Sequence, residues 1–196
     1  MEYLDIDSIN VLESGPICLR NYLTFLCQKD PRVRDLIKSN NKDLKNDFKN
    51  IREKLEIGRG VSSTEFARRI KEYGFLSEMI ITDTSDISKY NDSFPLFACL
   101  KNKNNETVYL FVTGISAQGI LVKDEKFNDA FIYNRIFEKA FNKRAIVIKD
   151  YSGFIKKYGS KADFKSYKDK NYDISDDDAF EAVVTIFEII GFFLFK

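Results

Sequence analysis

The stretch "LESGPICLRNYL", residues 12–23, joins a tight turn to the beginning of a helix. Ser14, Gly15 and Pro16 are turn residues, and proline is pre-organised for the first turn of a helix. The apolar residues that follow recur at helical spacing and predict a helix over residues 16–28. Enzymes often place a nucleophile at such a junction, so Ser14 is the first candidate for a functional side chain.

The composition limits the chemistry that Ser14 could support. The 196 residues include no histidine, which excludes Ser-His-Asp and Cys-His catalysis, the usual zinc sites and the commonest general base near pH 7. We expect neither a metal nor a cofactor. The formal net charge of +1 provides no field that would attract nucleic acid.

The cysteines and the N-terminus indicate where the protein resides. Cys18, Cys27 and Cys99 are an odd number without the spacing of a disulfide framework, which indicates a reducing compartment. The acidic start "MEYLDIDSIN" lacks the cationic region of a secretory signal. We therefore expect a cytoplasmic protein, with the inner face of the cytoplasmic membrane as a further location.

The order of predicted elements is helices first and then an antiparallel sheet, which is an α+β arrangement. Ser62 or Ser63 is the expected cap of the last helix in the first group, and Gly74 is its expected end. After residue 28, the helices are expected over 33–40, 44–55 and 64–74. Short apolar runs predict strands over 75–83, 94–102, 107–114, 119–125 and 144–150, with a helix over 134–143.

The last part of the chain differs in character, and we expect two units, residues 1–150 and 151–196. The second unit begins with a polar, lysine-rich stretch, typical of a solvated connector; the alternative is a basic segment that faces a membrane. The run 179–195 predicts an apolar helix that is short for a membrane span and contains Glu181 and Glu188. We expect it to be buried against the domain or a partner, and a membrane-edge helix or the start of a longer membrane protein is the alternative.

Residues 11–149 resemble the peptidase C39 domain, a papain-like cysteine-protease domain found at the N-termini of ABC transporters that export leader peptides. "SGPICL" (14–19) resembles the family's motif around the nucleophilic cysteine, with Ser14 in the place of that cysteine. The match continues through "GRGVSSTEFARRIKEYGF" (58–75), "FPLFACLKN" (94–102) and "ETVYLFV" (106–112). On this resemblance, Ser8 takes the position of the family's glutamine, Thr107 that of the catalytic histidine and Asp124 that of the catalytic aspartate.

The resemblance implies a papain-like fold whose active site has lost its chemistry. Thiol proteolysis needs a thiolate, a base that activates it and donors for the oxyanion, and Ser14, Thr107 and Ser8 replace all three. We therefore expect a degenerate peptidase that is not an enzyme. The resemblance places Ser14 and Thr107 on opposite walls of a cleft. Tyr109 shares a sheet face with Thr107 and is expected either to stack on a bound chain or to fill the core.

The resemblance further implies a role. In transporters of the hemolysin-exporter kind, a non-catalytic C39-like domain holds the unfolded substrate for type I secretion. The expected partners are an unfolded polypeptide or secretion substrate, and the membrane and nucleotide-binding domains of an ABC transporter; nucleic acid is not expected. One alternative is a free-standing pseudo-peptidase that acts as an adaptor, regulator or effector. Another is an active hydrolase that uses Ser14 with a lysine or aspartate base.

Overall fold

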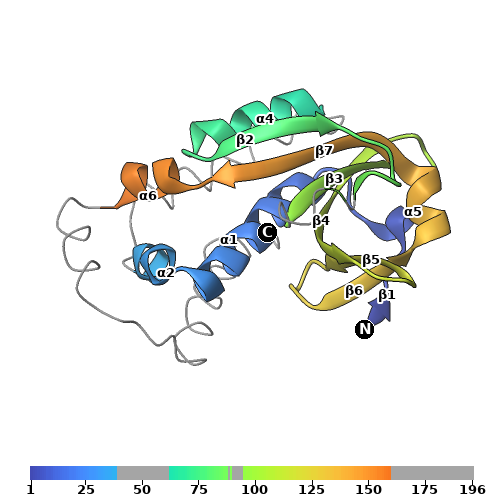
Figure 1. The fold of residues 1–196 in the computed structure, drawn as a ribbon, viewed down its shortest axis with the longest axis horizontal. Coiled ribbons are helices and arrows are strands. Elements are labelled where there is room, and N and C mark those ends of the chain that lie inside the picture. Colours follow the sequence, from blue (N-terminus) through green and yellow to red (C-terminus); the bar gives the residue numbers. More distant parts are fainter. Residues whose placement is uncertain (39–61, 88, 90–94, 160–196) are drawn as a thin grey trace.

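The described chain folds around a single mixed sheet (Figure 1). The computed structural model describes residues 1–38, 62–87, 89 and 95–159. In these ranges the strand order is β1-β6-β5-β4-β3-β7-β2, and every neighbouring pair is antiparallel except β1 with β6. The strands are β1 Glu2–Tyr3, β2 Leu76–Ile81, β3 Leu96–Lys101, β4 Thr107–Ile115, β5 Gly119–Lys123, β6 Asp129–Tyr133 and β7 Phe141–Asp150. The α+β class predicted from the sequence is confirmed.

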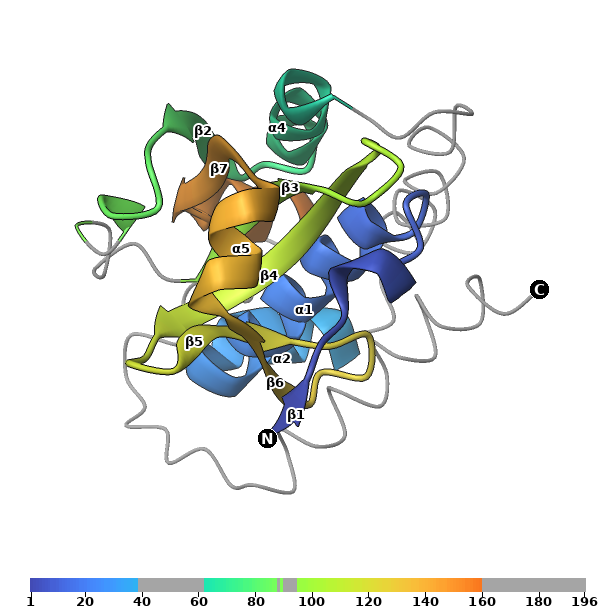
Figure 2. The ribbon, with the colours of Figure 1, turned by 90° about the vertical axis from the view of Figure 1, so that its right-hand side faces the viewer.

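Helices cover both faces of this sheet. They are η1 Ile6–Ser8, α1 Ser14–Lys29, α2 Pro31–Lys38, α4 Ser63–Glu72, α5 Asn134–Ala140 and α6 Ser152–Tyr158. One core lies between the sheet and the group α1, α2, α4 and α6, and a second core lies on the opposite face, under α5 and η1. Figure 2 shows α1 and α5 on different sides of β4.

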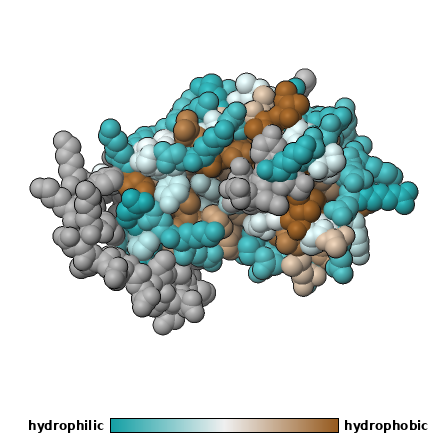
Figure 3. Space-filling view, in the orientation of Figure 1, coloured by the Kyte–Doolittle hydropathy of each residue, from teal (hydrophilic) through white to brown (hydrophobic). Residues whose placement is uncertain are grey.

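The middle strands explain why part of the sequence is apolar without alternation. In β3, Phe97 and Cys99 face the core under α1, whereas Ala98 and Leu100 face the core under α5. Both faces are therefore buried, and such a strand needs a continuous apolar run. At the surface the apolar residues are divided: Figure 3 shows them in separate patches among hydrophilic residues on the face in view.

The ends of α4 follow the sequence prediction. The Ser62 hydroxyl accepts a hydrogen bond from the backbone N–H of Glu65, 3.2 Å away, and thereby caps the helix. Gly74 follows the helix with a φ of +90°, a backbone conformation that only glycine adopts without strain. A side chain there would also meet the backbone of Gly153 at 2.6 Å, so this turn requires glycine on two grounds.

The structure differs from the sequence prediction just after residue 150. Residues 151–159 were expected in a solvated connector, but Ser152–Tyr158 form α6, and Phe154, Ile155 and Tyr158 are buried in the core under α1. These three apolar side chains share one face of a short helix, and the lysines between them conceal the pattern. The packed part of the described chain extends past residue 150 to Tyr158. The division of the chain into two units stays a prediction.

Several other predictions concern element bounds. The helix predicted over 134–143 ends at Ala140, and β7 begins directly afterwards at Phe141. The helices predicted over 44–55 and 179–195 lie outside the described residues. The elements β1, η1 and β6 were not predicted. In the part of the chain that the structure describes, no helix is both long enough and apolar enough to span a membrane.

Candidate functional site

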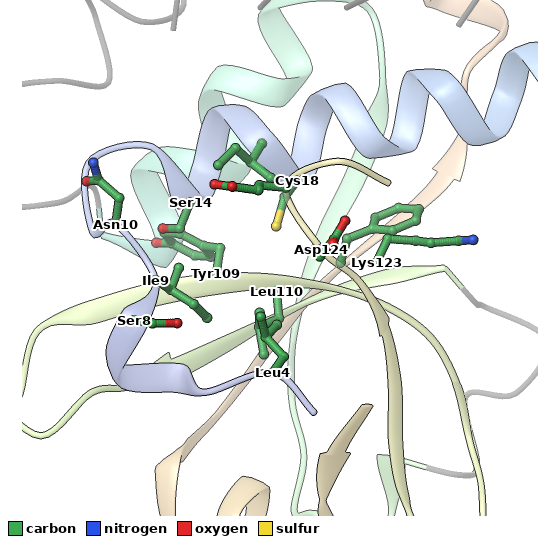
Figure 4. A pocket seen from close by; sticks show the side chains of 13 residues that line it. Leu4, Ser8, Ile9, Asn10, Ser14, Cys18, Tyr109, Leu110, Lys123 and Asp124 are labelled. Atoms are coloured by element: carbon green, nitrogen blue, oxygen red, sulfur yellow. The ribbon is translucent and has the colours of Figure 1, made fainter. Parts of the chain in front are cut away.

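A pocket of about 260 Å³ lies where the N-terminus of α1 meets the sheet; we call it the Ser14 pocket. Three walls enclose it: the N-terminal segment from Leu4 to Asn10, the first turns of α1, and the strands β4 and β5 with the turn that follows β5. Figure 4 shows the side chains that line it. Ser8, Ser14, Tyr109 and Asp124, all singled out from the sequence, line this one pocket.

Ser14 is fixed by a bond to its own turn. It is the first residue of α1, is only 1% exposed, and its hydroxyl donates to the backbone carbonyl of Val11 at 3.1 Å. The helix cap is Glu13, whose side chain makes no capping bond. Ser14 could be expected to cap the helix as a serine at its start, but it does not, because the chain is already helical at this residue and the hydroxyl binds the preceding turn instead.

Cys18 lies one helical turn after Ser14, on the same face of α1, and Figure 4 shows its sulfur pointing into the pocket. Burial raises the pKa of the Cys18 thiol well above its ordinary value, and the nearby charge of Arg20 does not offset this. The thiol is therefore protonated at neutral pH. A protonated thiol is a weak nucleophile, so Cys18 acts here as a wall of the pocket.

Tyr109 forms the wall that faces Ser14, from strand β4. It is 3% exposed, and its ring lies 4.6 Å from the ring of Phe66 in α4. Burial is the main cause that raises the pKa of its phenol well above the ordinary value, so the phenol stays protonated near pH 7. Most of Tyr109 fills the core and one side of it lines the pocket, and the expectation that it stacks on a bound chain stays a prediction.

Thr107 does not line the Ser14 pocket. It begins β4 beside the β3–β4 turn, where its hydroxyl accepts a hydrogen bond from the Lys101 ammonium at 3.0 Å. The expectation that Ser14 and Thr107 form opposite walls is therefore not met, and Tyr109 stands opposite Ser14 instead. Thr107 and Tyr109 share one face of β4. However, α1 crosses the sheet near Tyr109 and Phe111, further along that strand.

The carboxylate of Asp124 serves its own turn. One of its oxygens accepts hydrogen bonds from the backbone N–H groups of Lys126 and Asn128, at 2.8 and 2.7 Å, and the other accepts from the Asn128 side chain. Asp124, which the resemblance puts in the position of the catalytic aspartate, thus holds the turn between β5 and β6. With its oxygens used in this way, Asp124 is not set up as a base for Ser14.

Two buried polar residues of α1 hold this turn against the helix. Asn21 is fully buried and donates from its side-chain amide to the backbone carbonyl of Asp124 at 2.9 Å. Arg20, 2% exposed, donates from its guanidinium to the backbone carbonyl of Glu125. Sequence reasoning missed both residues. The available signal was a pair of polar side chains in an otherwise apolar helix, which indicates buried groups with specific partners.

Comparison with protein-family models finds no match, and comparison with curated proteins finds none either. Solved structures do match. The peptidase domain of Streptococcus mutans ComA is 18% identical, with a TM-score of 0.42, over 46% of this chain and 76% of that one. A double glycine motif protease from an AMS/PCAT transporter, in complex with the leader peptide, is 16% identical, with a TM-score of 0.46, over 74% of this chain and 90% of that one.

The peptidase domain of Streptococcus ComA, a bi-functional ABC transporter involved in a quorum sensing pathway, is 15% identical. Its TM-score is 0.46, and the match covers 76% of this chain and all of that one (100%). All three are described as peptidase domains or proteases. At such identities the likeness concerns the fold alone.

Proposed function

We propose that this protein is a non-catalytic, C39-like domain that holds an unfolded polypeptide for a type I secretion ABC transporter. The observation that carries this proposal is the content of the Ser14 pocket. A cavity stands where the resemblance places an active site, and it presents a hydroxyl bound to Val11, a protonated thiol and a protonated phenol.

These groups do not support hydrolysis. A serine hydroxyl needs a base within hydrogen-bond reach to become a nucleophile. The chain contains no histidine, and the Asp124 carboxylate is bonded into its turn. A pocket that offers no imidazole, and whose Asp124 carboxylate is already hydrogen-bonded in its turn, is suited to binding rather than hydrolysis, which favours the pseudo-peptidase over an active hydrolase based on Ser14.

A binding assay with matched variants tests the proposal. A permanently unfolded polypeptide and a folded control protein are titrated against the wild type, Ile17→Glu and Leu12→Glu. Ile17 is half-buried and lines the pocket, whereas Leu12 is exposed on the preceding turn and does not line it. We expect weak binding of the unfolded chain only, because ordering a disordered chain offsets much of the contact energy.

The two variants distinguish binding at the Ser14 pocket from nonspecific hydrophobic binding. Ile17→Glu should weaken binding at least severalfold, because the new carboxylate would be desolvated when a chain covers the pocket, and Leu12→Glu should bind like the wild type. Both variants should show the circular dichroism of the wild type. Equal binding of the folded control, or equal loss in the two variants, would contradict the proposal.

The second candidate function is a free-standing pseudo-peptidase that acts as an interaction adaptor or effector. The same pocket supports it, and the two candidates differ in their partner. An ATP-binding cassette encoded beside this reading frame, and binding of its purified nucleotide-binding domain to this chain, would favour the transporter. Absence of both would favour the adaptor.

A further inference from the structure

The Ser14 pocket is apolar below its mouth. The rim of the pocket contains polar and charged residues, among them Ser8, Asn10 and Glu125, and all three are exposed. The deeper walls come from three elements, and Figure 4 labels most of their side chains. These are Leu4 and Ile9 from the N-terminal segment, Ile17 and Cys18 from α1, and Tyr109 and Phe111 from β4.

Two of the three charged residues that line the pocket, Lys123 and Asp124, are engaged elsewhere, and the third, Glu125, lies at the exposed rim. The Lys123 ammonium pairs with the Asp129 carboxylate at 2.8 Å and lies 4.6 Å from the centre of the Phe127 ring, and Figure 4 shows the Lys123 side chain extending away from the cavity. The Asp124 carboxylate holds its own turn. An ionic group that entered the pocket would lose its hydration without gaining a charged partner from these two residues.

The size of the cavity sets the scale of its occupant. A cavity of about 150 Å³ lined by Leu, Ile and Phe accepts benzene, and pockets for drug-sized ligands begin at about 300 Å³. The Ser14 pocket, at about 260 Å³, lies between these sizes. It therefore has room for one large side chain.

We propose that the Ser14 pocket receives a single bulky apolar side chain, aromatic or long aliphatic, of the bound polypeptide. This specificity rests on the polypeptide-binding function proposed above. A glycine would leave the apolar walls without contacts, and an acidic side chain would be desolvated without a partner, because Lys123 is already paired with Asp129. The pocket thus selects unfolded chains by a hydrophobic anchor residue.

Host peptides with one variable position test this specificity. The peptides are short, unstructured and identical except for a central Phe, Leu, Gly or Glu, and their binding to the full-length protein is measured by fluorescence anisotropy. Burial of one Phe or Leu side chain predicts roughly tenfold to hundredfold tighter binding than Gly. The Glu peptide should bind no better than the Gly peptide.

Two pocket-filling variants locate the effect. Cys18→Met adds volume from α1, and Ile9→Trp adds volume from the half-buried wall of the N-terminal segment. The chain has no tryptophan, so Ile9→Trp also supplies a unique fluorescent reporter at the pocket. Leu76→Trp, on the exposed edge strand β2 and outside the pocket, is the matched control.

Each outcome has a distinct meaning. In Ile9→Trp the preference for Phe over Gly should fall below about twofold, while Leu76→Trp should keep the wild-type preference. If Cys18→Met fails to fold, Ile9→Trp alone decides. Binding of all four peptides with equal affinity would overturn the anchor proposal and leave polypeptide binding intact. If neither these peptides nor a long unfolded polypeptide binds, polypeptide binding itself fails.

Discussion

The side-chain amide of Asn21 in α1 donates a hydrogen bond to the backbone carbonyl of Asp124, with 2.9 Å between nitrogen and oxygen. This bond fixes the turn after β5 against the helix that carries Ser14, so the two sides of the Ser14 pocket keep their separation. Asn21 itself is fully buried, whereas the carbonyl that it binds belongs to a half-buried residue.

We therefore predict that Asn21→Ala destabilises the protein and loosens the pocket. The Asp124 carbonyl would lose one of its two hydrogen bonds, because the backbone N–H of Phe127 also donates to it at 3.2 Å, and the loss of one such bond costs about 0.5–1.5 kcal/mol. Chemical denaturation measures this loss, and hydrogen exchange should become faster in the turn after β5. Lys126→Ala, on the exposed part of the same turn, is the control and should change stability by no more than about 0.5 kcal/mol. Unchanged exchange in Asn21→Ala would show that the turn is held by other contacts.

The second prediction concerns the hydroxyl of Ser14. In Ser14→Ala the hydrogen bond to the Val11 carbonyl is lost, and we expect a loss of stability of about 0.5–1.5 kcal/mol by chemical denaturation. The magnitude resembles that of a lost helix cap, but the partner is the preceding turn. Peptide binding should be retained in this variant. Lost binding with unchanged stability would instead make Ser14 a ligand contact.

Ser14→Cys should not create a peptidase. The introduced thiol would have no imidazole beside it, and its reference pKa of about 8.5 would rise further in a position that is 1% exposed. The measurement is hydrolysis of a peptide library near pH 7 by the wild type, Ser14→Ala and Ser14→Cys. Turnover by any of them that depends on residue 14 would contradict the assignment as a pseudo-peptidase.

The parts of the site that could be predicted from the sequence are those whose apolar residues recur at a regular spacing. The helix behind Ser14 and the strand that carries Tyr109 were predictable, because their apolar residues recur at the spacing of a helix and of a buried strand. Alternation in a strand does not distinguish Thr107 from Tyr109, since both point to the same face. Only the position at which α1 crosses β4 decides between them, and that is a tertiary property.

Other features left weak signals in the sequence. Strand β1 contains only Glu2 and Tyr3, which is too short for any pattern. Helix α6 places Phe154, Ile155 and Tyr158 in the core, but the lysines around them conceal its periodicity. The bond between Asn21 and the turn after β5 joins residues about a hundred positions apart, and local sequence patterns do not report such a contact.

The fourth prediction concerns the contact between Gly74 and Gly153. Gly74→Ala should be strongly destabilising, because the residue has a φ of +90° and its new methyl group would lie 2.6 Å from the backbone of Gly153. The backbone strain alone costs about 1–3 kcal/mol, and the steric overlap adds to it. Thermal and chemical unfolding measure the loss.

A second glycine supplies the control for Gly74. In Gly114→Ala, within β4, the methyl group would meet only the Leu121 side chain, at an ordinary contact distance of 3.5 Å. Its cost should stay below about 1 kcal/mol. Equal effects of the two substitutions would show that the turn after α4 can move away from α6.

The last prediction concerns acid stability and Asp30, which lies between α1 and α2. Burial alone would raise the pKa of the Asp30 carboxyl, but the hydrogen bonds from Arg32 (2.7 Å) and from the Tyr151 hydroxyl (3.0 Å) outweigh it and hold the pKa below its usual value. In the unfolded chain the pKa returns to about 3.9. The folded state therefore binds this proton less readily than the unfolded state does.

From this sign it follows that Asp30 contributes stability that is fully present above about pH 4 and is lost as the pH falls through the folded-state pKa. We expect Asp30→Asn, which keeps an oxygen for the backbone N–H of Arg32, to lose less stability than the wild type between neutral and strongly acidic pH. Tyr151→Phe removes one of the bonds that lower the pKa and should lie between the two. Urea unfolding as a function of pH measures the three curves. Parallel curves for wild type and Asp30→Asn would show that the Asp30 carboxyl has the same proton affinity in the folded and unfolded chains. The contribution of Asp30 to stability, through its contacts with Arg32 and Tyr151, would then not depend on pH.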